Sequence, residues 1–133
     1  MSGATDDRAV HLQNHVNDNL LGSGHCDRAA ILDPKGAVLA CSAGFAVPEG
    51  TAIAAAIDDQ RRLTTEGLTV DGAVYFAVEA EEGRFCGKRG ATGIVVFKSG
   101  EFIVIGGHGA GIDHANCRMV VEAMSDHLGA CGG

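Results

Sequence analysis

Residues 92–106 read TGIVVFKSGEFIVIG, which is two apolar runs on either side of Ser99-Gly100. Both runs, Thr92 to Lys98 and Phe102 to Gly106, are rich in the β-branched and aromatic residues that pack well in strands. A serine–glycine pair between two such runs predicts a tight hairpin turn. Hairpins that follow one another along a chain predict an antiparallel sheet, and we expect this stretch to supply two of its strands.

The sheet extends along the chain in both directions from this hairpin. Residues 28–42 contain two short apolar segments around Asp33-Pro34-Lys35-Gly36, whose proline and glycine suit a turn, and they predict a second hairpin. After Gly67 the hydrophobic period changes to two, and we expect strands that are interrupted at Asp71-Gly72 and continue through Arg84 to Lys88. The apolar positions of this alternation are Leu68, Val70, Val74, Phe76 and Val78.

Three segments have the apolar spacing of helices. The first covers about Asp7 to Leu21 and ends at the glycines of residues 22–24, and the second covers roughly residues 49–62. The third covers about Asn116 to Leu128 and has one continuous apolar stripe. Helices placed before, within and after a set of hairpins predict an α+β domain in which helices cover the faces of an antiparallel sheet.

The length and charge of the chain limit its class. Its 133 residues suit one domain, residues 1–133, in which we expect about residues 1–8 to be a flexible N-terminal extension. The net charge of −7 argues against a nucleic-acid-binding protein. Four bases nevertheless fall within fifteen residues, and Arg118 follows them, so we expect a local basic patch that faces an acidic partner. These four bases are Arg84, Lys88, Arg89 and Lys98.

The cysteines and the N-terminus predict a cytoplasmic protein. The five cysteines are odd in number, widely spaced and without a CxxC motif, so we interpret them as reduced thiols. The first eight residues are acidic where a signal peptide would be basic, and no apolar segment follows them.

No motif in the chain predicts catalysis. The glycine-rich segment 106–111 fits neither of the common phosphate-binding spacings, and we interpret it as a loop. His108, His114 and Cys117 are too loosely spaced for a zinc site, and we expect both histidines to be solvent-facing. We therefore predict no metal, no cofactor and no enzyme activity. An enzyme with an unrecognised thiol nucleophile stays open as a third alternative.

Several segments, in order along the chain, resemble the pattern of the profilin family, most closely that of its plant and amoeba branch. They are Asn19 to Gly24, Ala29 to Leu32, Val38 to Ser42, Gly72 to Tyr75, Gly87 to Gly90, Ile105-Gly106 and Cys117 to Glu122. The resemblance covers about residues 10–133 and is specific through the order and spacing of its parts. It implies a central antiparallel β-sheet with the N- and C-terminal helices packed on one face and the shorter helix on the other.

The resemblance also implies a partner and a site. Profilins bind monomeric actin through the far strands and the start of the C-terminal helix, and they regulate actin nucleotide exchange and filament assembly. The positions that match the actin-binding surface are Lys88, Arg89, Thr92, Lys98, His108, Asn116, Arg118 and Glu122. Acidic phosphoinositide head groups are a second ligand expected for these bases, although the net charge of −7 makes that binding weak.

A second family activity, the binding of proline-rich segments such as those of formin-like proteins, is expected to be weakened here. The family uses aromatic rings that stack on a polyproline II helix, in a groove between the terminal helices. This chain has no tryptophan and a single tyrosine, Tyr75. The matching groove positions hold Leu12, His15, Leu39, Met124 and His127.

The leading hypothesis is therefore a cytoplasmic, cytoskeleton-associated protein that binds monomeric actin and has a weakened or altered proline-rich-ligand groove. The alternative is a profilin-fold adaptor that lacks actin activity and binds another protein or a phosphoinositide surface. Charge reversal at Lys88 and Arg89 separates the two, because only the first hypothesis needs these bases for the main partner.

Overall fold

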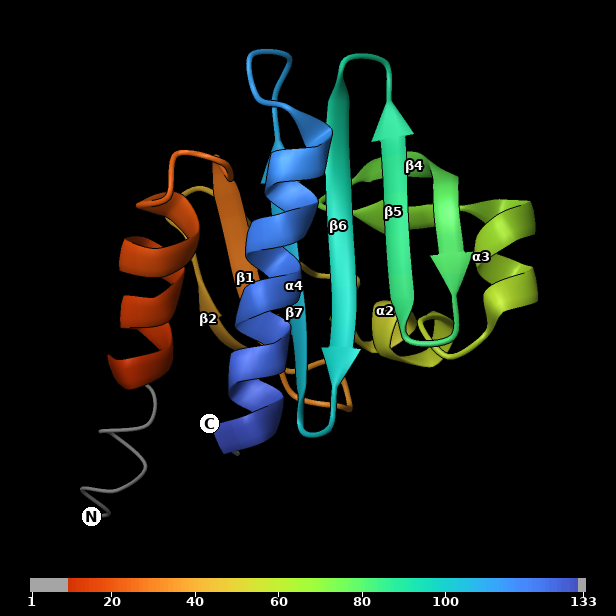
Figure 1. Cartoon of the computed structure of the whole chain (residues 1–133). Coiled ribbons are helices and arrows are strands. Elements are labelled where there is room, and N and C mark those ends of the chain that lie inside the picture. Colours follow the sequence, from red (N-terminus) through yellow and green to blue (C-terminus); the bar gives the residue numbers. More distant parts are fainter. Residues whose placement is uncertain (1–9, 132–133) are drawn as a thin grey trace.

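A computed structural model of the chain describes residues 10–131, so the extension expected over residues 1–8 lies outside the described residues. Within the described range, one sheet of seven strands carries helices on both faces (Figure 1). The elements in chain order are an N-terminal helix over residues 10–21 that ends in the π-helix η1 (His15–Leu21), β1 (Arg28–Leu32), β2 (Val38–Cys41), α2 (Gly50–Ala56), α3 (Gln60–Glu66), β3 (Leu68–Val70), β4 (Ala73–Glu81), β5 (Arg84–Arg89), β6 (Thr92–Ser99), β7 (Phe102–His108) and α4 (His114–Cys131).

The sheet has the strand order β2-β1-β7-β6-β5-β4-β3, and every neighbouring pair is antiparallel. The predicted hairpin of residues 92–106 is confirmed, since Ser99 pairs with Phe102 across a turn in which Gly100 has a φ of 54°. The predicted hairpin of residues 28–42 is confirmed as well. In its turn, one carboxylate oxygen of Asp33 accepts hydrogen bonds from two backbone N–H groups at 2.9 Å.

The two central strands explain why the sequence of residues 92–106 is so apolar. Successive side chains of a strand point to opposite faces, so a strand covered on both faces contributes alternate residues to two cores. In β6, Val95 and Phe97 belong to one core, whereas Ile94 and Val96 belong to the other. In β7, the same alternation places residues 102 and 104 in the first core and residues 103 and 105 in the second.

The terminal helices share one face of the sheet and the short helices share the other. Leu12, Val16 and Leu20 of the N-terminal helix are buried in the same core as Cys117 and Val121 of α4. The buried residues of α2 and α3 belong to the core on the opposite face. This arrangement confirms the α+β fold expected from the sequence.

The single helix expected over residues 49–62 is wrong in one respect, because the structure has two helices there. Helix α2 ends at Ala56, and α3 begins after Asp59, whose backbone leaves the helical region with φ −112° and ψ 85°. The Asp59 side chain accepts a hydrogen bond from the N–H of Arg62 at 3.1 Å. Aspartate is a favoured N-cap residue, so Asp59 starts a new helix where the apolar spacing alone suggested a continuous one.

Strand β4 differs from the pattern that predicted it. The alternation of apolar residues marks the strand correctly, yet Phe76 is 65% exposed and Val78 is 61% exposed, whereas Tyr75 is buried. The pairing of β4 with β5 shifts between Ala77 and Glu79, which indicates a β-bulge. The bulge reverses the alternation only beyond Ala77, whereas Phe76 is exposed because α4 packs on β6 and β7 and leaves this part of β4 uncovered.

Gly106 of β7 allows α4 to approach the sheet. A Cβ atom at this position would collide with the Val121 side chain and would lie 3.0 Å from the Cys26 sulfur. We expect Gly106→Ala to lower the free energy of unfolding by about 1–3 kcal/mol, because overpacking forces the helix away from the strand. Equilibrium urea unfolding measures this change.

The matched control for this substitution is Gly111→Ala. A Cβ atom at Gly111 meets nothing within 4 Å, so its effect should stay within about 0.5 kcal/mol. Equal effects of the two substitutions would contradict a close contact between α4 and β7 at Gly106.

Candidate functional site

One surface of the sheet extends beyond α4 and is formed by β4, β5 and the start of α4. We call it the far-strand face and define it by Phe76, Glu79, Lys88 and Arg118. Arg89 follows Lys88 at the end of β5, where adjacent strand residues point to opposite sides of the sheet. The residue pairs Phe76–Lys88 and Glu79–Cys86 lie opposite each other in the ladder between β4 and β5. Opposed residues project from the same side of a sheet. Cys86 is in the core beneath α4, so its strand neighbour two positions on, Lys88, also projects on the α4 side.

Arg118 connects α4 to the strands of the far-strand face. Its Nε donates to Glu79 Oε1 at 3.0 Å, and its Nη1 lies 3.5 Å from Glu122 Oε1. Arg84 lies 3.9 Å from the other oxygen of Glu122, and both guanidinium groups lie over the Phe97 ring at 5.5 Å and 5.2 Å. These bases are therefore largely neutralised by neighbouring acids, and they position α4 against the sheet.

Lys88 and Arg89 are the bases that remain available to a partner. Both side chains are exposed at the end of β5, and neither forms an ion pair with another residue in the range 10–131. The turn behind them is held by Thr92, whose hydroxyl donates to the carbonyl oxygen of Arg89 at 2.8 Å. The two cations therefore project from a fixed turn.

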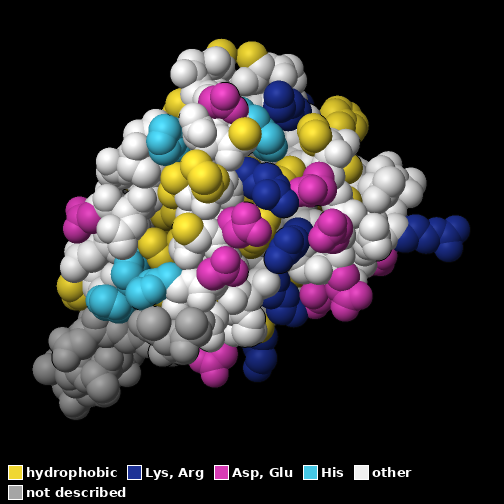
Figure 2. Space-filling model, in the orientation of Figure 1, with side chains coloured by type: hydrophobic (Ala, Val, Ile, Leu, Met, Phe, Trp, Pro, Cys, Tyr) yellow, Lys and Arg dark blue, Asp and Glu magenta, His cyan; other side chains and the backbone are white. Residues whose placement is uncertain are grey.

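An exposed apolar patch lies next to these cations. Phe76 is opposite Lys88 in the ladder, and Val78 follows it on β4. Figure 2 shows a column of dark blue Lys and Arg side chains over the right-hand strands, flanked by magenta acids and with yellow apolar side chains beside its upper end. An exposed aromatic residue with cations around it is typical of a protein-binding surface. Phe76 and Val78 were not among the site residues predicted from the sequence.

Lys98 and His108 were predicted to face actin, and the structure places neither of them on the far-strand face. Lys98 projects on the opposite side of the sheet, where its Nζ donates to Asp58 Oδ2 at 2.6 Å. Asp58 lies between α2 and α3, so this ion pair holds the short helices to β6. His108 is only 2% exposed, whereas Thr92, Asn116, Arg118 and Glu122 are all half-buried at the surface.

His108 is buried and contacts the half-buried His114, so His108 is not the solvent-facing loop residue that the sequence suggested. His108 Nδ1 lies 3.0 Å from the carbonyl oxygen of Gly109, and its Nε2 lies 2.8 Å from His114 Nδ1. His114 Nε2 is buried and has no hydrogen-bond partner among the described residues. Burial, together with the charges of His108, Lys88 and Arg118, lowers the pKa of His114 below its usual value, so the neutral imidazole of His114 is favoured.

A hollow between the N-terminal helix and α4 corresponds to the expected proline-rich-ligand groove. Its volume is about 320 Å³, and its lining residues are Asn19, Ser23, Val120, Ala123, Met124 and His127. The structure thus places Met124 and His127 at the groove and brings the His15 ring to 5.4 Å from that of His127. Leu39 is half-buried on β2 against the same core. Leu12 is only 1% exposed, so it supports the groove from below and cannot contact a ligand there.

Histidines gather beside this groove. His11 and His15 are one turn apart on the N-terminal helix, and their Nε2 atoms lie 3.1 Å from each other. Their ring centroids are 4.4 Å apart. Burial, followed by the charges of His11 and His127, lowers the pKa of His15 below its usual value. The neutral imidazole is therefore the favoured form of His15 at neutral pH.

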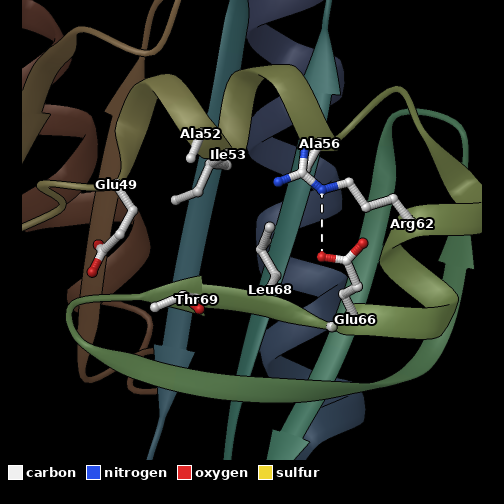
Figure 3. A pocket seen from close by; sticks show the side chains of 9 residues that line it. Glu49, Ala52, Ile53, Ala56, Arg62, Glu66, Leu68 and Thr69 are labelled. Carbon is white, nitrogen blue, oxygen red and sulfur yellow. Dashed lines mark ion pairs between the residues drawn. The ribbon is translucent and has the colours of Figure 1, made fainter.

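A second hollow lies on the other face of the sheet, between α2, α3 and β3 (Figure 3). Its volume is about 130 Å³. Its charged side chains already have partners, since Arg62 lies 3.9 Å from Glu66 and the Glu49 carboxylate accepts two backbone N–H groups at 2.8 Å. Nothing in its lining favours a particular ligand.

No group of three or more His, Cys, Asp and Glu side chains in the part of the chain that the structure describes could hold a metal ion. None of the helices in residues 10–131 is long and apolar enough to cross a membrane.

These features define a class of protein before any comparison is made. A small α+β domain with an exposed aromatic and basic face, and with a groove between its terminal helices, is typical of protein-binding modules. The model of the family described as Profilin matches residues 10–133. The chain belongs to the profilin family, whose members are actin-binding regulators of polymerisation and not enzymes.

The individual relatives agree with this assignment. Profilin-2 of Acanthamoeba castellanii is 34% identical over 118 residues, covering 87% of this chain and 94% of the relative. The crystal structure of Acanthamoeba castellanii profilin II superimposes with a TM-score of 0.87 at 33% identity, covering 92% of this chain and 99% of that one. Mouse profilin IIa, in complex with a double repeat from the FH1 domain of mDia1, has a TM-score of 0.76 at 23% identity, which shows the shared fold.

Proposed function

We propose that this chain binds monomeric actin through the far-strand face and thereby regulates actin nucleotide exchange and filament assembly. In this proposal it is a single-domain cytoplasmic protein that associates with the cytoskeleton. Lys88 and Arg89 supply charge for an acidic partner, and they accelerate encounter more than they hold the complex. Thr92, Asn116, Arg118 and Glu122 surround them with polar groups.

The observation that carries the proposal is the exposure of Phe76 beside Lys88. The Phe76 side chain is 65% exposed, so most of its apolar surface stays in contact with water and does not contribute to the stability of the fold. A partner that covers Phe76 would gain the free energy of burying this side chain. Aromatic side chains are accordingly enriched at the centres of protein interfaces. Phe76 and Val78 are thus the apolar contacts, and the bases form the polar rim around them.

The test is a titration of the purified full-length chain into monomeric ATP-actin that carries a fluorescent nucleotide, with nucleotide release as the readout. We expect saturable binding that changes the release rate. Phe76→Ala should weaken the affinity by about ten- to thirtyfold, which corresponds to about 1.4–2 kcal/mol at a buried interface contact.

The matched control is Val10→Ala, because Val10 is similarly exposed, at 59%, but lies on the N-terminal helix. This variant should bind actin as tightly as the parent chain does. Absence of binding by the parent chain well above micromolar concentrations would refute the proposal. Equal losses of actin affinity in both variants would show that the actin contact is not on the far-strand face.

Two further ligands are proposed as weak ones. The groove between the terminal helices presents imidazole, thioether and aliphatic groups, so proline-rich segments of formin-like proteins would bind weakly or with altered selectivity. Phosphoinositide head groups would bind weakly too, because Arg84 and Arg118 are already paired with Glu122 and Glu79. Lys88 and Arg89 would then be the main contacts for a head group.

A further inference from the structure

His11 and His15 are arranged like a pair of metal ligands. Side chains four residues apart lie on the same face of a helix, and two histidines at this spacing form the helical half of known zinc sites. Two nitrogens bound to one tetrahedral zinc ion at about 2.0–2.1 Å are separated by about 3.3 Å. The two Nε2 atoms here are 3.1 Å apart and share a hydrogen bond, so a cation bound between them would replace the shared proton at nearly the same nitrogen–nitrogen distance.

Asn19 completes the surroundings of this pair. A metal-bound histidine usually donates its other ring N–H to a neighbouring acceptor, which fixes the tautomer and the ring orientation. Asn19 Nδ2 lies 2.8 Å from Nδ1 of His15, on the side of the ring opposite to His11, so the amide N–H donates to Nδ1 in this arrangement. Binding of a cation at Nε2 requires the amide group to turn, so that its oxygen accepts from Nδ1–H and the Nε2 lone pair is left for the cation.

The exposure of the pair distinguishes it from the other close histidines of the chain. His11 is exposed and His15 is 8% exposed, so a cation can reach their facing nitrogens from solvent and keep water in its remaining positions. His108 is 2% exposed and its ring faces His114 at 2.8 Å inside the molecule. A cation would have to open that packed contact to bind there.

We propose that His11 and His15 together bind one late first-row divalent cation, such as Zn²⁺, on the N-terminal helix beside α4. Imidazole is a preferred ligand of Zn²⁺, Cu²⁺ and Ni²⁺, whereas Ca²⁺ and Mg²⁺ prefer oxygen ligands. The net charge of −7 favours the approach of a cation. The site has two protein ligands, and it is independent of the actin-binding proposal.

The test is a titration of Zn²⁺ alone into the reduced full-length chain at neutral pH, followed by calorimetry and by ¹⁵N NMR of the imidazole rings. We expect one ion per chain, with the Nε2 signals of His11 and His15 shifting together. Loss of an outer-sphere partner of a metal-bound histidine costs roughly 10- to 100-fold in affinity, so loss of a direct ligand should cost at least about tenfold. His11→Gln and His15→Gln should each show this loss.

His25→Gln is the control, because His25 is a surface histidine outside this pair and its loss should leave the affinity unchanged. Three results would overturn the proposal: no saturable shift of the two rings up to millimolar Zn²⁺, unchanged affinity in His11→Gln, or binding that shifts no imidazole signal and so uses cysteine thiols. His11→Gln is the decisive variant, since its side chain is exposed and its loss does not disturb a core.

Discussion

Reversing both charges at the end of β5, with Lys88→Glu and Arg89→Glu, should lower the affinity for monomeric actin by at least about 100-fold. Like charges placed against each other at an interface cost several kcal/mol, and about 2.7 kcal/mol already corresponds to 100-fold. The effect should be large because these cations have no ion-pair partner within residues 10–131, and Lys88 lies opposite the exposed Phe76. The nucleotide-release titration measures it.

The expected loss has two components that kinetics can separate. Removal of steering lowers the association rate, and that part should shrink as salt is added. Repulsion within the docked complex raises the dissociation rate and should persist at high salt. A loss that vanishes entirely in salt would mean that Lys88 and Arg89 only guide the approach of actin.

A matched double variant controls for net charge. Lys35→Glu with Arg61→Glu makes the same change in net charge, but Lys35 lies in the turn between β1 and β2, and Arg61 lies on α3 across the sheet. Actin affinity should stay within about threefold of the parent, as expected for long-range charge effects at physiological salt. If both doubles lost affinity equally, the far-strand face would not be the docking surface. If neither did, the adaptor alternative would gain support.

The sequence predicted the sheet and its covering helices because these depend on local signals. The turns at Asp33 to Gly36 and at Ser99-Gly100 contain residues that strongly favour turns, and these residues predicted the two hairpins. The apolar stripe of α4 predicted its buried face, where Cys117 and Val121 meet the sheet. The placement of the terminal helices together on one face came from the resemblance to the profilins, and the register of the strands was not predicted.

The errors arose where a side chain's direction depends on a distant partner. In the sequence, Lys98 cannot be distinguished from Arg84, Lys88 and Arg89. Its ion pair with Asp58, forty residues earlier, shows that it projects on the side of the sheet that carries α2 and α3. His108 is flanked by glycines, which suggested an exposed loop, but it ends β7 and packs against His114. Period-two counting could not detect the bulge in β4, because one inserted residue leaves the local composition unchanged.

Phe76 shows which signal could have found the missed part of the site. It is a large aromatic residue in a strand whose opposed residue in β5 is a lysine, and such a pair faces solvent far more often than a core. Once the register of the β4–β5 hairpin is known, Phe76 and Lys88 lie on the same face. Because a lysine side chain is usually exposed, Lys88 then predicts that Phe76 is exposed as well.

The groove between the terminal helices supports a prediction in the opposite direction, a gain of binding. His15→Tyr with Leu39→Trp restores aromatic rings at two positions where the family usually has them, on the N-terminal helix and on β2. We expect the affinity for a polyproline peptide to rise by at least about tenfold over the parent chain, because stacked aromatic anchors contribute roughly 1–2 kcal/mol each at such contacts. Fluorescence anisotropy of a labelled decaproline measures the affinity of each variant.

The control keeps the same residue types and moves one ring to the other face of β2. Val38 precedes Leu39 and is 41% exposed, and adjacent strand residues point to opposite faces, so His15→Tyr with Val38→Trp should gain no more than the tyrosine alone provides. The chain has no tryptophan of its own, so the fluorescence of the introduced residue shows directly whether peptide covers it. If Leu39→Trp gave no gain in a variant that unfolds as cooperatively as the parent, ring loss would not explain weak binding. The narrow approach between the N-terminal helix and α4 would then be the limiting feature.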